Sequence, residues 1–477
     1  MWKNKGKAIN MWYFLFFIYL MLIIMVIFVE RKRPTEALLW VIIMIFLPYF
    51  GTLLYLIFGS TLSIKLTSLF RKRKLKKQVH NIKKPLSIDI DNTHLSKVDL
   101  QVVKFNNIYN NSVLTCCNKA NYYIDGLSHY TQLFKDIKNA NNNIFIEFYT
   151  IHNDIVGQTL VTYLAEKASQ GVEVWVMIDF IANLSTPKKM FKPLIEAGGK
   201  IVRVKPYLTH YRSHRKIVVI DQKIAYIGGM NIGKQYANMA KIKNPWRDTQ
   251  IRLEGACTSI LNNYFLEDWL CSIRRKEWQY SLNHISNMPN ISYETTNSLC
   301  QFIVGGVDNN KESVKMCYLS MIRSAKKRIR IQSPYFIPDA SLLDALKTAA
   351  ASGVHIELII PGIKASFFLD PVTNYYSGQL LEYGTKVYKY NGYIHAKTMI
   401  IDDELCCIGS VNMDMRSLMV DDEVCGVFYE NTLVSQYNTI YNQDIVNSVP
   451  YTLEEFNNRS NLERILESIF LPFAPLM

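Results

Sequence analysis

Two copies of one short pattern hold the side chains best suited to chemistry. Each copy reads H-x-K-x4-D-x6-G-[GS]-x-N, so a histidine and a lysine two residues apart precede an aspartate and a glycine turn that ends in asparagine. Residues two apart on a strand point to the same face, so we expect each histidine to project beside its lysine. The copies contain His214, Lys216, Asp221 and Asn231, and His395, Lys397, Asp402 and Asn412.

These side chains suit attack on a phosphodiester. Lys216 and Lys397 can neutralise the non-bridging oxygens, and Asn231 and Asn412 can donate hydrogen bonds to them. One imidazole can attack phosphorus while the other protonates the leaving alkoxide and later deprotonates the acceptor. Because the lysines supply the compensating charge, the pattern calls for no metal ion and no cofactor.

The two copies lie in an internal repeat. A single His-x-Lys is more often structural, but each copy here follows a strand–helix–strand unit at almost the same offset. Such units are typical of mixed or parallel sheets flanked by helices. The sequence therefore predicts an α/β protein with two tandem, pseudo-twofold domains that place both motifs at one seam. The expected elements are strands 144–149 and 171–179 around helix 158–169, and strands 329–333 and 353–360 around helix 341–351.

The pattern resembles the HKD signature of the phospholipase D superfamily, from about residue 105 to the C-terminus. The resemblance implies a covalent phosphohistidine, with His214 as nucleophile and His395 as general acid and base, although spacing alone leaves their order open. It also places Asp221 and Asp402 in the catalytic set. Their position after a strand favours a structural role in a turn instead.

Members of this superfamily orient each histidine with a carboxylate located downstream. By resemblance, Asp248 fits the histidine of the first motif and Glu423 fits that of the second. Such a carboxylate would hold the ring and stabilise imidazolium. The alternative for each is an ordinary surface acid.

The N-terminal region predicts a membrane hairpin. Residues 11–29 and 37–58 carry no charge, and each stretch is about long enough to cross a hydrocarbon core as a helix. A signal peptide is the alternative for the first, but basic residues rather than a small-residue cleavage site follow it. Whether Pro48 and Gly51 kink the second stretch or make it re-entrant stays open.

Flanking charges predict the orientation of this hairpin. Lysines precede the first stretch and the basic run 71–77 follows the second, which favours both ends inside and the catalytic domains on the cytosolic side of the cell membrane.

The nine cysteines form no metal-binding spacing and fit reduced, buried thiols. The basic run suits anionic headgroups or a solvated flank equally well. We expect a multi-pass hairpin at 1–60, a polar linker at 61–104, and domains at 105–290 and 291–477.

Longer phrases narrow the superfamily resemblance. They are Arg31-Lys32-Arg33-Pro34, Leu47-Pro48-Tyr49-Phe50-Gly51, Tyr55-Leu56-Ile57-Phe58-Gly59, Ser213-His214-Arg215-Lys216, Trp246-Arg247-Asp248-Thr249, Phe265-Leu266-Glu267-Asp268-Trp269, Ser333-Pro334-Tyr335-Phe336-Ile337-Pro338, Asn412-Met413-Asp414-Met415-Arg416-Ser417 and Leu471-Pro472-Phe473-Ala474-Pro475-Leu476. These phrases resemble the bacterial cardiolipin synthases, which implies transfer of a phosphatidyl group from one phosphatidylglycerol to another, giving cardiolipin and glycerol. Two departures, Gln250 for a common histidine and Asp422 for a common asparagine, leave the acceptor preference open.

Other functions remain open at this point. Hydrolysis of phospholipid, or transfer to another alcohol, needs the same residues, whereas a superfamily nuclease is disfavoured by the apolar stretches and by the lack of a recognisable base-stacking array. A non-enzymatic scaffold is disfavoured because both motifs are complete. The net charge of +14 suits anionic partners. We expect phosphatidylglycerol and anionic membrane lipids, and no nucleic acid. Arg416 could hold a headgroup or pair with Asp414 or Asp421.

Overall fold

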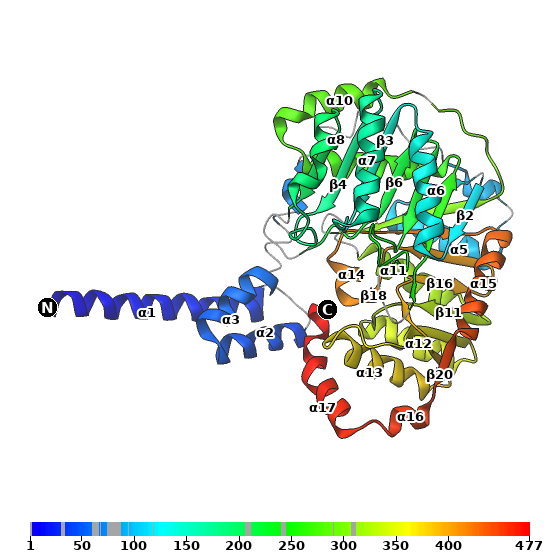
Figure 1. The fold of residues 1–477 in the computed structure, drawn as a ribbon. Coiled ribbons are helices and arrows are strands. Elements are labelled where there is room, and N and C mark those ends of the chain that lie inside the picture. The colour runs from blue at the N-terminus through cyan, green and yellow to red at the C-terminus, as the bar shows by residue number, and fades with distance from the viewer. Residues whose placement is uncertain are drawn as a thin grey trace.

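The computed structural model describes residues 2–29, 34–59, 66, 68–73, 87–93, 95–117, 119–205, 211–239, 245–289, 291–306 and 312–477. Two α/β domains are stacked on each other, and an apolar helical region projects from one side of the second domain (Figure 1). Three segments lie outside the described residues: the basic turn between the two apolar stretches (30–33), the end of the basic run (74–77), and the loop that carries His210.

The first domain is built on a seven-stranded sheet of order β2-β9-β7-β6-β3-β4-β5. The pairs β3–β4 and β4–β5 are parallel, and the other pairs are antiparallel, so the sheet is mixed as predicted. The predicted unit is present as β3 (Asn143–Phe148), α7 (Ile155–Ser169) and β4 (Glu173–Asp179). The other strands are β2 (Lys119–Tyr123), β5 (Lys200–Val204), β6 (Ile217–Ile220), β7 (Ile224–Gly228) and β9 (Gln250–Glu254).

The second domain repeats this arrangement in a nine-stranded sheet of order β1-β10-β19-β17-β16-β11-β13-β14-β20. Its run β19-β17-β16-β11-β13-β14 matches β9-β7-β6-β3-β4-β5 strand for strand, which confirms the predicted duplication. The strands are β1 (Thr115–Cys116), β10 (Leu299–Gly305), β11 (Arg328–Gln332), β13 (His355–Pro361), β14 (Lys386–Tyr390), β16 (Thr398–Ile401), β17 (Leu405–Gly409), β19 (Glu423–Phe428) and β20 (Ser448–Tyr451).

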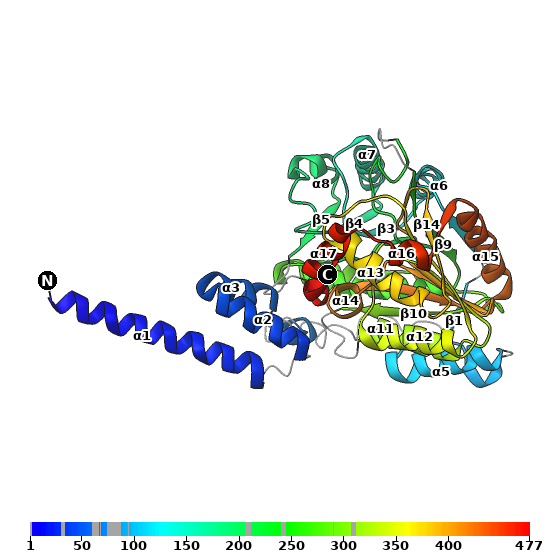
Figure 2. The same ribbon diagram turned by 90° about the horizontal axis from the view of Figure 1, so that it is seen from below.

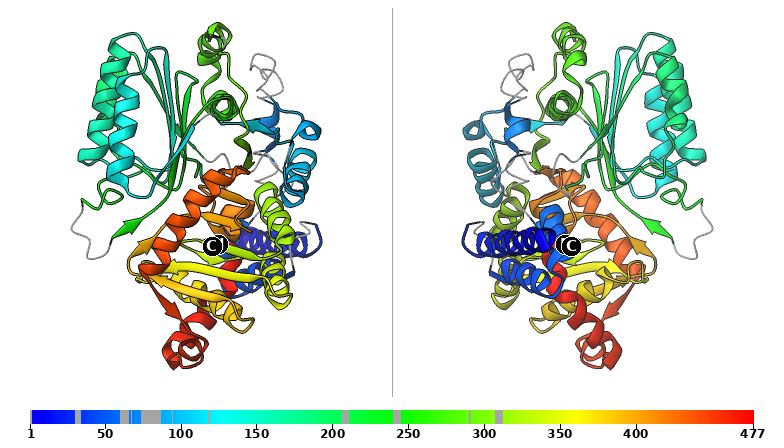
Figure 3. Two further views of the ribbon diagram at one scale, coloured as in Figure 1. Left: turned by 90° about the vertical axis from the view of Figure 1, so that its right-hand side faces the viewer. Right: turned by 90° about the vertical axis from the view of Figure 1, so that its left-hand side faces the viewer.

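Three apolar cores hold the layers together. A central core joins the facing sides of the two sheets, where Phe145 and Trp175 of one domain share a cluster with Phe302 and Phe428 of the other. Two outer cores lie under the helices that cover the outer face of each sheet (Figure 3). On the first domain these helices are α6 (Gly126–Lys138), α7 and α8 (Lys192–Glu196), and on the second they include α11 (Ser313–Ser324), α12 (Ala340–Ala351) and α13 (Leu369–Leu381). The helices α9 (Cys257–Ser272), α10 (Trp278–Asn287) and α15 (Asn431–Val446) contribute to the central core instead. The remaining helices of the second domain are α14 (Met415–Met419), α16 (Leu453–Asn457) and α17 (Asn461–Phe470).

The predicted boundary between linker and first domain is wrong. Residues 97–110 form the helix α5 (Lys97–Asn110), whose Val102 and Val103 are buried in the outer core of the second domain. The following strand β1 pairs with β10 of the second sheet. The polar composition of this stretch concealed the helix, because only a narrow stripe of α5 is apolar. All nine cysteines are buried thiols, as expected.

Among the described residues, one helix is long and apolar enough to span a membrane. Within α1 (Trp2–Ile24) and the π-helical turn that follows it (Met25–Val29), residues Met11–Phe28 have a mean hydropathy of 2.6, and only 6% of this stretch is buried. This helix projects away from the domains (Figure 2). Because it starts near the N-terminus, its length and composition alone do not separate a span from a signal sequence.

The predicted second span at 37–58 is not one straight helix. It consists of α2 (Pro34–Phe46), α3 (Pro48–Leu54) and a π-helical turn (Tyr55–Gly59). The chain turns at Leu47, just before Pro48, and α3 packs against α2 so closely that a Cβ at Gly51 would collide with the backbone oxygen of Ile43. Proline directly after the turn, at the start of α3, and glycine at the contact explain why the apolar run folds back.

Candidate active site

Two backbone segments cross between the domains and bring the motifs together. Just before the first histidine, Ser213 forms a parallel bridge with Asp422 of the second domain, and the backbone nitrogen of His214 donates to the Asp422 carbonyl at 2.9 Å. In the second motif, β15 (Tyr393–Ile394) pairs with β8 (Trp246–Arg247) of the first domain. Asp422, which holds the first motif, immediately precedes the candidate carboxylate Glu423. Likewise β8, which holds the second motif, immediately precedes the candidate carboxylate Asp248.

The histidine–carboxylate pairs cross the domain boundary. His214 Nδ1 lies 2.8 Å from Glu423 Oε1, and His395 Nδ1 lies 2.6 Å from Asp248 Oδ2. The predicted assignment of Asp248 to His214 and Glu423 to His395 is wrong, although both carboxylates do orient a histidine. The exchange follows from the two crossing segments, which place each carboxylate beside the histidine of the opposite motif.

The His-x-Lys segments precede the sheet strands rather than lying on them. His214 and Lys216 come before β6, and His395 and Lys397 come before β16. The lysine side chain still returns toward its histidine, since Lys216 Nζ donates to the His214 carbonyl at 2.6 Å. Lys397 Nζ lies 2.7 Å from His395 Nδ1. Both lysines are buried, whereas the two histidine side chains keep 12% and 11% of their surface exposed.

The electrostatics of the two motifs are shared. Burial, followed by the charges of Lys216 and of Lys397 from the other motif, holds the pKa of His214 well below its usual value. Burial and Lys397 lower the pKa of His395 to about 3, and Lys216 adds to this effect across the seam. Each ring therefore responds to the ammonium group of the opposite motif, which requires both motifs to face one site.

The cations and carboxylates are also perturbed. Burial lowers the pKa of Lys216 to about 7 and that of Lys397 to about 8. Burial raises the pKa of Glu423 to about 7, because Lys216 only partly compensates. Burial alone would raise the pKa of Asp248, but Lys397 and His395 outweigh it and hold that pKa below its usual value. Asp248 is thus the more strongly ionised member of the two carboxylates.

The two asparagines of the motifs differ in their partners. Asn231 Nδ2 donates to the Tyr236 hydroxyl at 3.1 Å. Asn412 is buried, and its Oδ1 has no hydrogen-bond partner among the described residues. A buried amide oxygen without a partner is costly unless a ligand completes it. Because an amide oxygen accepts hydrogen bonds, Asn412 marks where a donor group of a ligand, such as a hydroxyl, would complete the site.

The motif aspartates serve the fold, and their place in the predicted catalytic set is wrong. The Asp221 carboxylate accepts from the backbone nitrogens of residues 141, 142 and 143 at 2.7–3.0 Å. Asp402 accepts in the same way from residues 326, 327 and 328. Both sit at the far end of their strand from the lysine, in the left-handed region with φ of 52° and 53°. They fix the loop that enters β3 or β11.

Small residues let the orienting carboxylates fit. A Cβ at Gly229 would collide with the Asp248 carboxylate, so glycine is needed there. The corresponding residue of the second motif is Ser410, whose hydroxyl donates to Glu423 Oε2. The [GS] position of the pattern thus leaves space for the Asp248 carboxylate in the first motif and donates a hydrogen bond to Glu423 in the second.

Three aromatic residues that the motif analysis missed flank the histidines. The Tyr149 ring lies 4.8 Å from that of His214, and the rings of Trp246 and Tyr393 lie 5.2 and 5.9 Å from that of His395. Two of them carried a signal, because Tyr149 ends the expected strand 144–149 and Trp246 belongs to the phrase that contains Asp248. No sequence feature singled out Tyr393. Aromatic rings therefore lie beside both histidines of the site.

Two residues left open by the sequence have defined partners. Arg416 forms an ion pair with Asp421, with Nε 2.8 Å from Oδ2, rather than pointing free into the site. Gln250 Oε1 accepts from the backbone nitrogen of Met230 at 3.2 Å and so supports the turn before Asn231.

A buried ionic network connects the segment after the apolar helices to the site. Arg71 belongs to the basic run that suited either headgroups or a solvated flank, but it is only 5% exposed and contacts Asp422 and Asp268, both at 2.7 Å. Arg215 also pairs with Asp268, and its Nε donates to the Glu423 carbonyl at 3.1 Å. The network therefore holds the loop that presents Glu423 to His214.

Replacing Arg71 by methionine is expected to destabilise the protein by about 3 kcal/mol, because two carboxylates lose their shared buried cation. The check is the thermal unfolding midpoint in detergent. Arg73→Met is the matched control, because Arg73 is exposed and should tolerate the change. An equal shift of both variants would contradict the role of Arg71 in the network.

Comparisons with known proteins agree with this geometry. The family model described as "Cardiolipin synthase, PLD-like domain" matches residues 133–269 and 318–445, and a model described as "Phospholipase_D-nuclease N-terminal" matches residues 17–60. The chain belongs to the cardiolipin synthase family. It is a phosphatidyltransferase of the phospholipase D superfamily, as the two motifs predict.

Individual relatives cover nearly the whole chain. The major cardiolipin synthase ClsA of Bacillus subtilis is 34% identical over 97% of this chain and 98% of its own length. A cardiolipin synthase of Staphylococcus aureus is 34% identical over 95% of this chain and 93% of its own. The phosphatidylserine synthase structure from Haemophilus influenzae has a TM-score of 0.60 at 16% identity, over 78% of this chain and 97% of that one, and supports the fold. Membership implies association with a membrane.

Proposed function

We propose that the chain transfers a phosphatidyl group from one phosphatidylglycerol to the headgroup hydroxyl of a second, giving cardiolipin and glycerol. The observation that carries the proposal is that each motif histidine contacts a carboxylate of the opposite domain, so that both histidines lie at one seam. The cardiolipin synthase family model matches residues in both domains, and this supports a phospholipid as the substrate.

The first step is attack of the His214 Nε2 lone pair on phosphorus. Nδ1 of that ring faces Glu423, which leaves Nε2 for the substrate. The bond from phosphorus to the glycerol oxygen breaks as the N–P bond forms, and a proton from His395 passes to that oxygen. Lys216, Lys397 and the motif asparagines stabilise the charge on the non-bridging oxygens. In the second step, His395 removes the proton of the acceptor hydroxyl, whose oxygen displaces His214 from phosphorus.

The carboxylate partners support this order of roles. His395 has to carry a proton between the two steps, and the ionised Asp248 beside it stabilises imidazolium. His214 faces Glu423, whose pKa is raised by burial, so its imidazolium receives less support. A phosphate between the lysines would offset their charge and raise the pKa of His395 toward the value needed for an acid.

Transfer competes with hydrolysis through concentration and access. A site tied to a membrane meets a high local concentration of lipid hydroxyl, which favours lipid over water as acceptor.

We further propose a multi-pass N-terminal anchor in the cell membrane, with the catalytic domains on the cytosolic side. In this arrangement α1 spans the bilayer and the folded-back α2 and α3 enter it from one side. Phosphatidylglycerol and other anionic lipids are the proposed partners.

The dependence of kcat/KM on pH is expected to be bell-shaped with a maximum near pH 7. Below that pH, Glu423 gains a proton at its pKa of about 7 and no longer accepts from His214. Above it, Lys216 and Lys397 lose their charge at pKa values of about 7 and 8. Activity profiles of the wild type and Glu423→Gln provide the check. An acidic limb that is identical in both would contradict the role of Glu423.

The reaction is tested by reconstituting the full chain with phosphatidylglycerol vesicles and resolving products by mass. Cardiolipin and glycerol in equal amounts are expected. Phosphatidic acid as the main lipid product would instead make the protein a hydrolase.

A further inference from the structure

Helix α17 exposes its apolar residues and buries a charged one. Leu462, Ile465 and Ile469 are 66%, 55% and 51% exposed, and their spacing places them on one face of the helix. Glu467, in contrast, is buried and pairs with Arg459. A helix on the surface of a water-soluble domain shows the opposite distribution, with its apolar stripe against the core.

Neighbouring aromatic residues enlarge this apolar face. Phe367 and Phe368, in the loop before α13, are 65% and 58% exposed. Their rings contact that of Phe470 at the end of α17, with centroids 5.4 and 5.1 Å apart, and Phe473 follows with 38% exposure. A contiguous cluster of this kind marks an interaction site on a protein surface.

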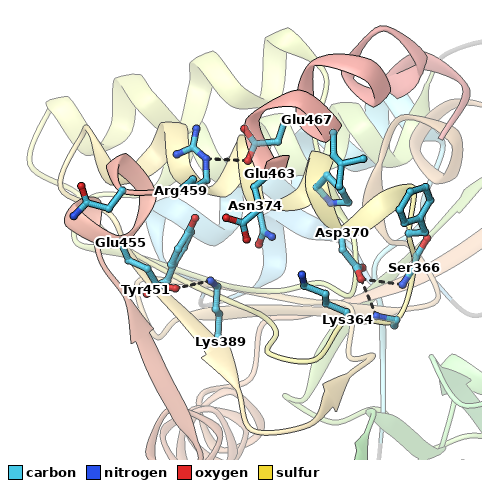
Figure 4. A pocket seen from close by; sticks show the side chains of 15 residues that line it. Lys364, Ser366, Asp370, Asn374, Lys389, Tyr451, Glu455, Arg459, Glu463 and Glu467 are labelled. Carbon is cyan, nitrogen blue, oxygen red and sulfur yellow. Dashed lines mark hydrogen bonds and ion pairs between the residues drawn. The ribbon is translucent and has the colours of Figure 1, made fainter. Parts of the chain in front are cut away.

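The scaffold that presents the face is polar and well connected (Figure 4). A cavity of about 480 Å³ lies behind it, between the loop 364–367, α13, α16 and α17. Within it Asp370 accepts from the backbone nitrogens of residues 365 and 366 at 2.7 and 2.9 Å and so fixes the loop that carries Phe367. The Arg459–Glu467 pair holds α17 in place. The apolar residues are thus turned outward by a fixed structure.

This face continues the apolar region at the N-terminus. After α17 the chain ends in a 3₁₀ turn (Leu471–Leu476), whose Leu476 packs against the cluster of Trp40, Met44 and Tyr55. The ribbon places this turn beside α2, on the side of the second domain from which α1 projects, and α17 runs across the direction of α1 (Figure 1). A bilayer crossed by α1 would meet α17 lengthwise.

We propose that α17 and the Phe367–Phe368 loop dock the second domain onto the lipid bilayer as an interfacial contact separate from the N-terminal helices. The occupant is the boundary between headgroups and acyl chains, where an amphipathic helix lies in the plane with its apolar side inward. The contact would fix the distance and tilt of the second domain relative to the lipids. It does not depend on the proposed reaction.

The test uses single cysteines that carry an environment-sensitive fluorophore in the full-length protein. All nine native cysteines are buried, so an introduced surface cysteine is the reactive one. Leu462→Cys and Ile469→Cys probe the face, and Val446→Cys, 83% exposed at the end of α15, is the control in the same domain. Each variant is reconstituted into phosphatidylglycerol–phosphatidylcholine vesicles that contain a lipid with a nitroxide quencher on its acyl chain.

At positions 462 and 469 we expect about a two-fold loss of fluorescence, because an interfacial helix buries its apolar face roughly 5–10 Å into the bilayer. Position 446 should keep its fluorescence and remain accessible to iodide. Equal iodide access at all three positions would overturn the proposal. So would protection of 462 and 469 in lipid-free detergent that increases with protein concentration, since that indicates a second copy on this face. The same measurement on the His395→Ala background separates docking from catalysis.

Discussion

Replacing His395 by alanine is expected to lower kcat for cardiolipin formation by about 10⁴-fold, the upper range for one positioned acid–base group. The ring has to give a proton to the leaving glycerol and take one from the acceptor, so both steps of the transfer lose their proton carrier. Substrate binding should change little, because Lys216, Lys397 and Asn412 remain. The measurement is the initial rate with labelled phosphatidylglycerol in vesicles.

The control for this change is His355→Ala. His355 is an exposed histidine at the start of β13 in the same domain, so its loss should leave the rate unchanged. The unfolding midpoint of both variants should match that of the wild type. Substantial transferase activity in a folded His395→Ala protein would remove His395 from the mechanism.

Replacing Asp248 by asparagine is expected to lower kcat by about 10²–10⁴-fold, although Asp248 belongs to the other domain from the histidine it serves. An amide cannot stabilise the imidazolium of His395 and can present the wrong group to its Nδ1–H. The effect should be larger on His395 than on His214, because Asp248 Oδ2 contacts His395 Nδ1 directly, whereas its charge acts on His214 only from a distance.

Nuclear magnetic resonance of ring-labelled histidine separates the two pairs. Asp248→Asn should shift the resonances of His395, and Glu423→Gln should shift those of His214. The reverse pattern would restore the assignment that the order of the motifs suggests and would contradict the crossed arrangement.

The chemistry of the site was predictable because it rests on residue types repeated at fixed spacing. The duplicated strand–helix–strand units and the two His-x-Lys segments follow from local pattern, and the structure confirms the duplication. The crossed carboxylates were not predictable, because they depend on the β8–β15 pairing and the Ser213–Asp422 bridge between segments far apart in the chain. Distance along the sequence favoured the wrong partner in both cases.

Two other errors have physical causes. Composition made 61–104 look like a linker, but α5 needs only a narrow apolar stripe to dock on the second domain. An uncharged run at 37–58 has the length of a span, yet Pro48 and Gly51 allow it to fold back on itself. In Arg71 the basic run supplies a buried structural cation, which charge alone does not distinguish from a headgroup contact.

The most direct test of a single site built from both motifs is a count of the covalent intermediate. The protein is mixed with phosphatidylglycerol labelled in its phosphate, quenched within one turnover, digested and analysed by mass spectrometry. The account predicts at most one phosphatidyl group per chain, located on His214, with an equal amount of released glycerol. Label on both histidines, or two groups per chain, would mean that each motif works alone and would contradict it.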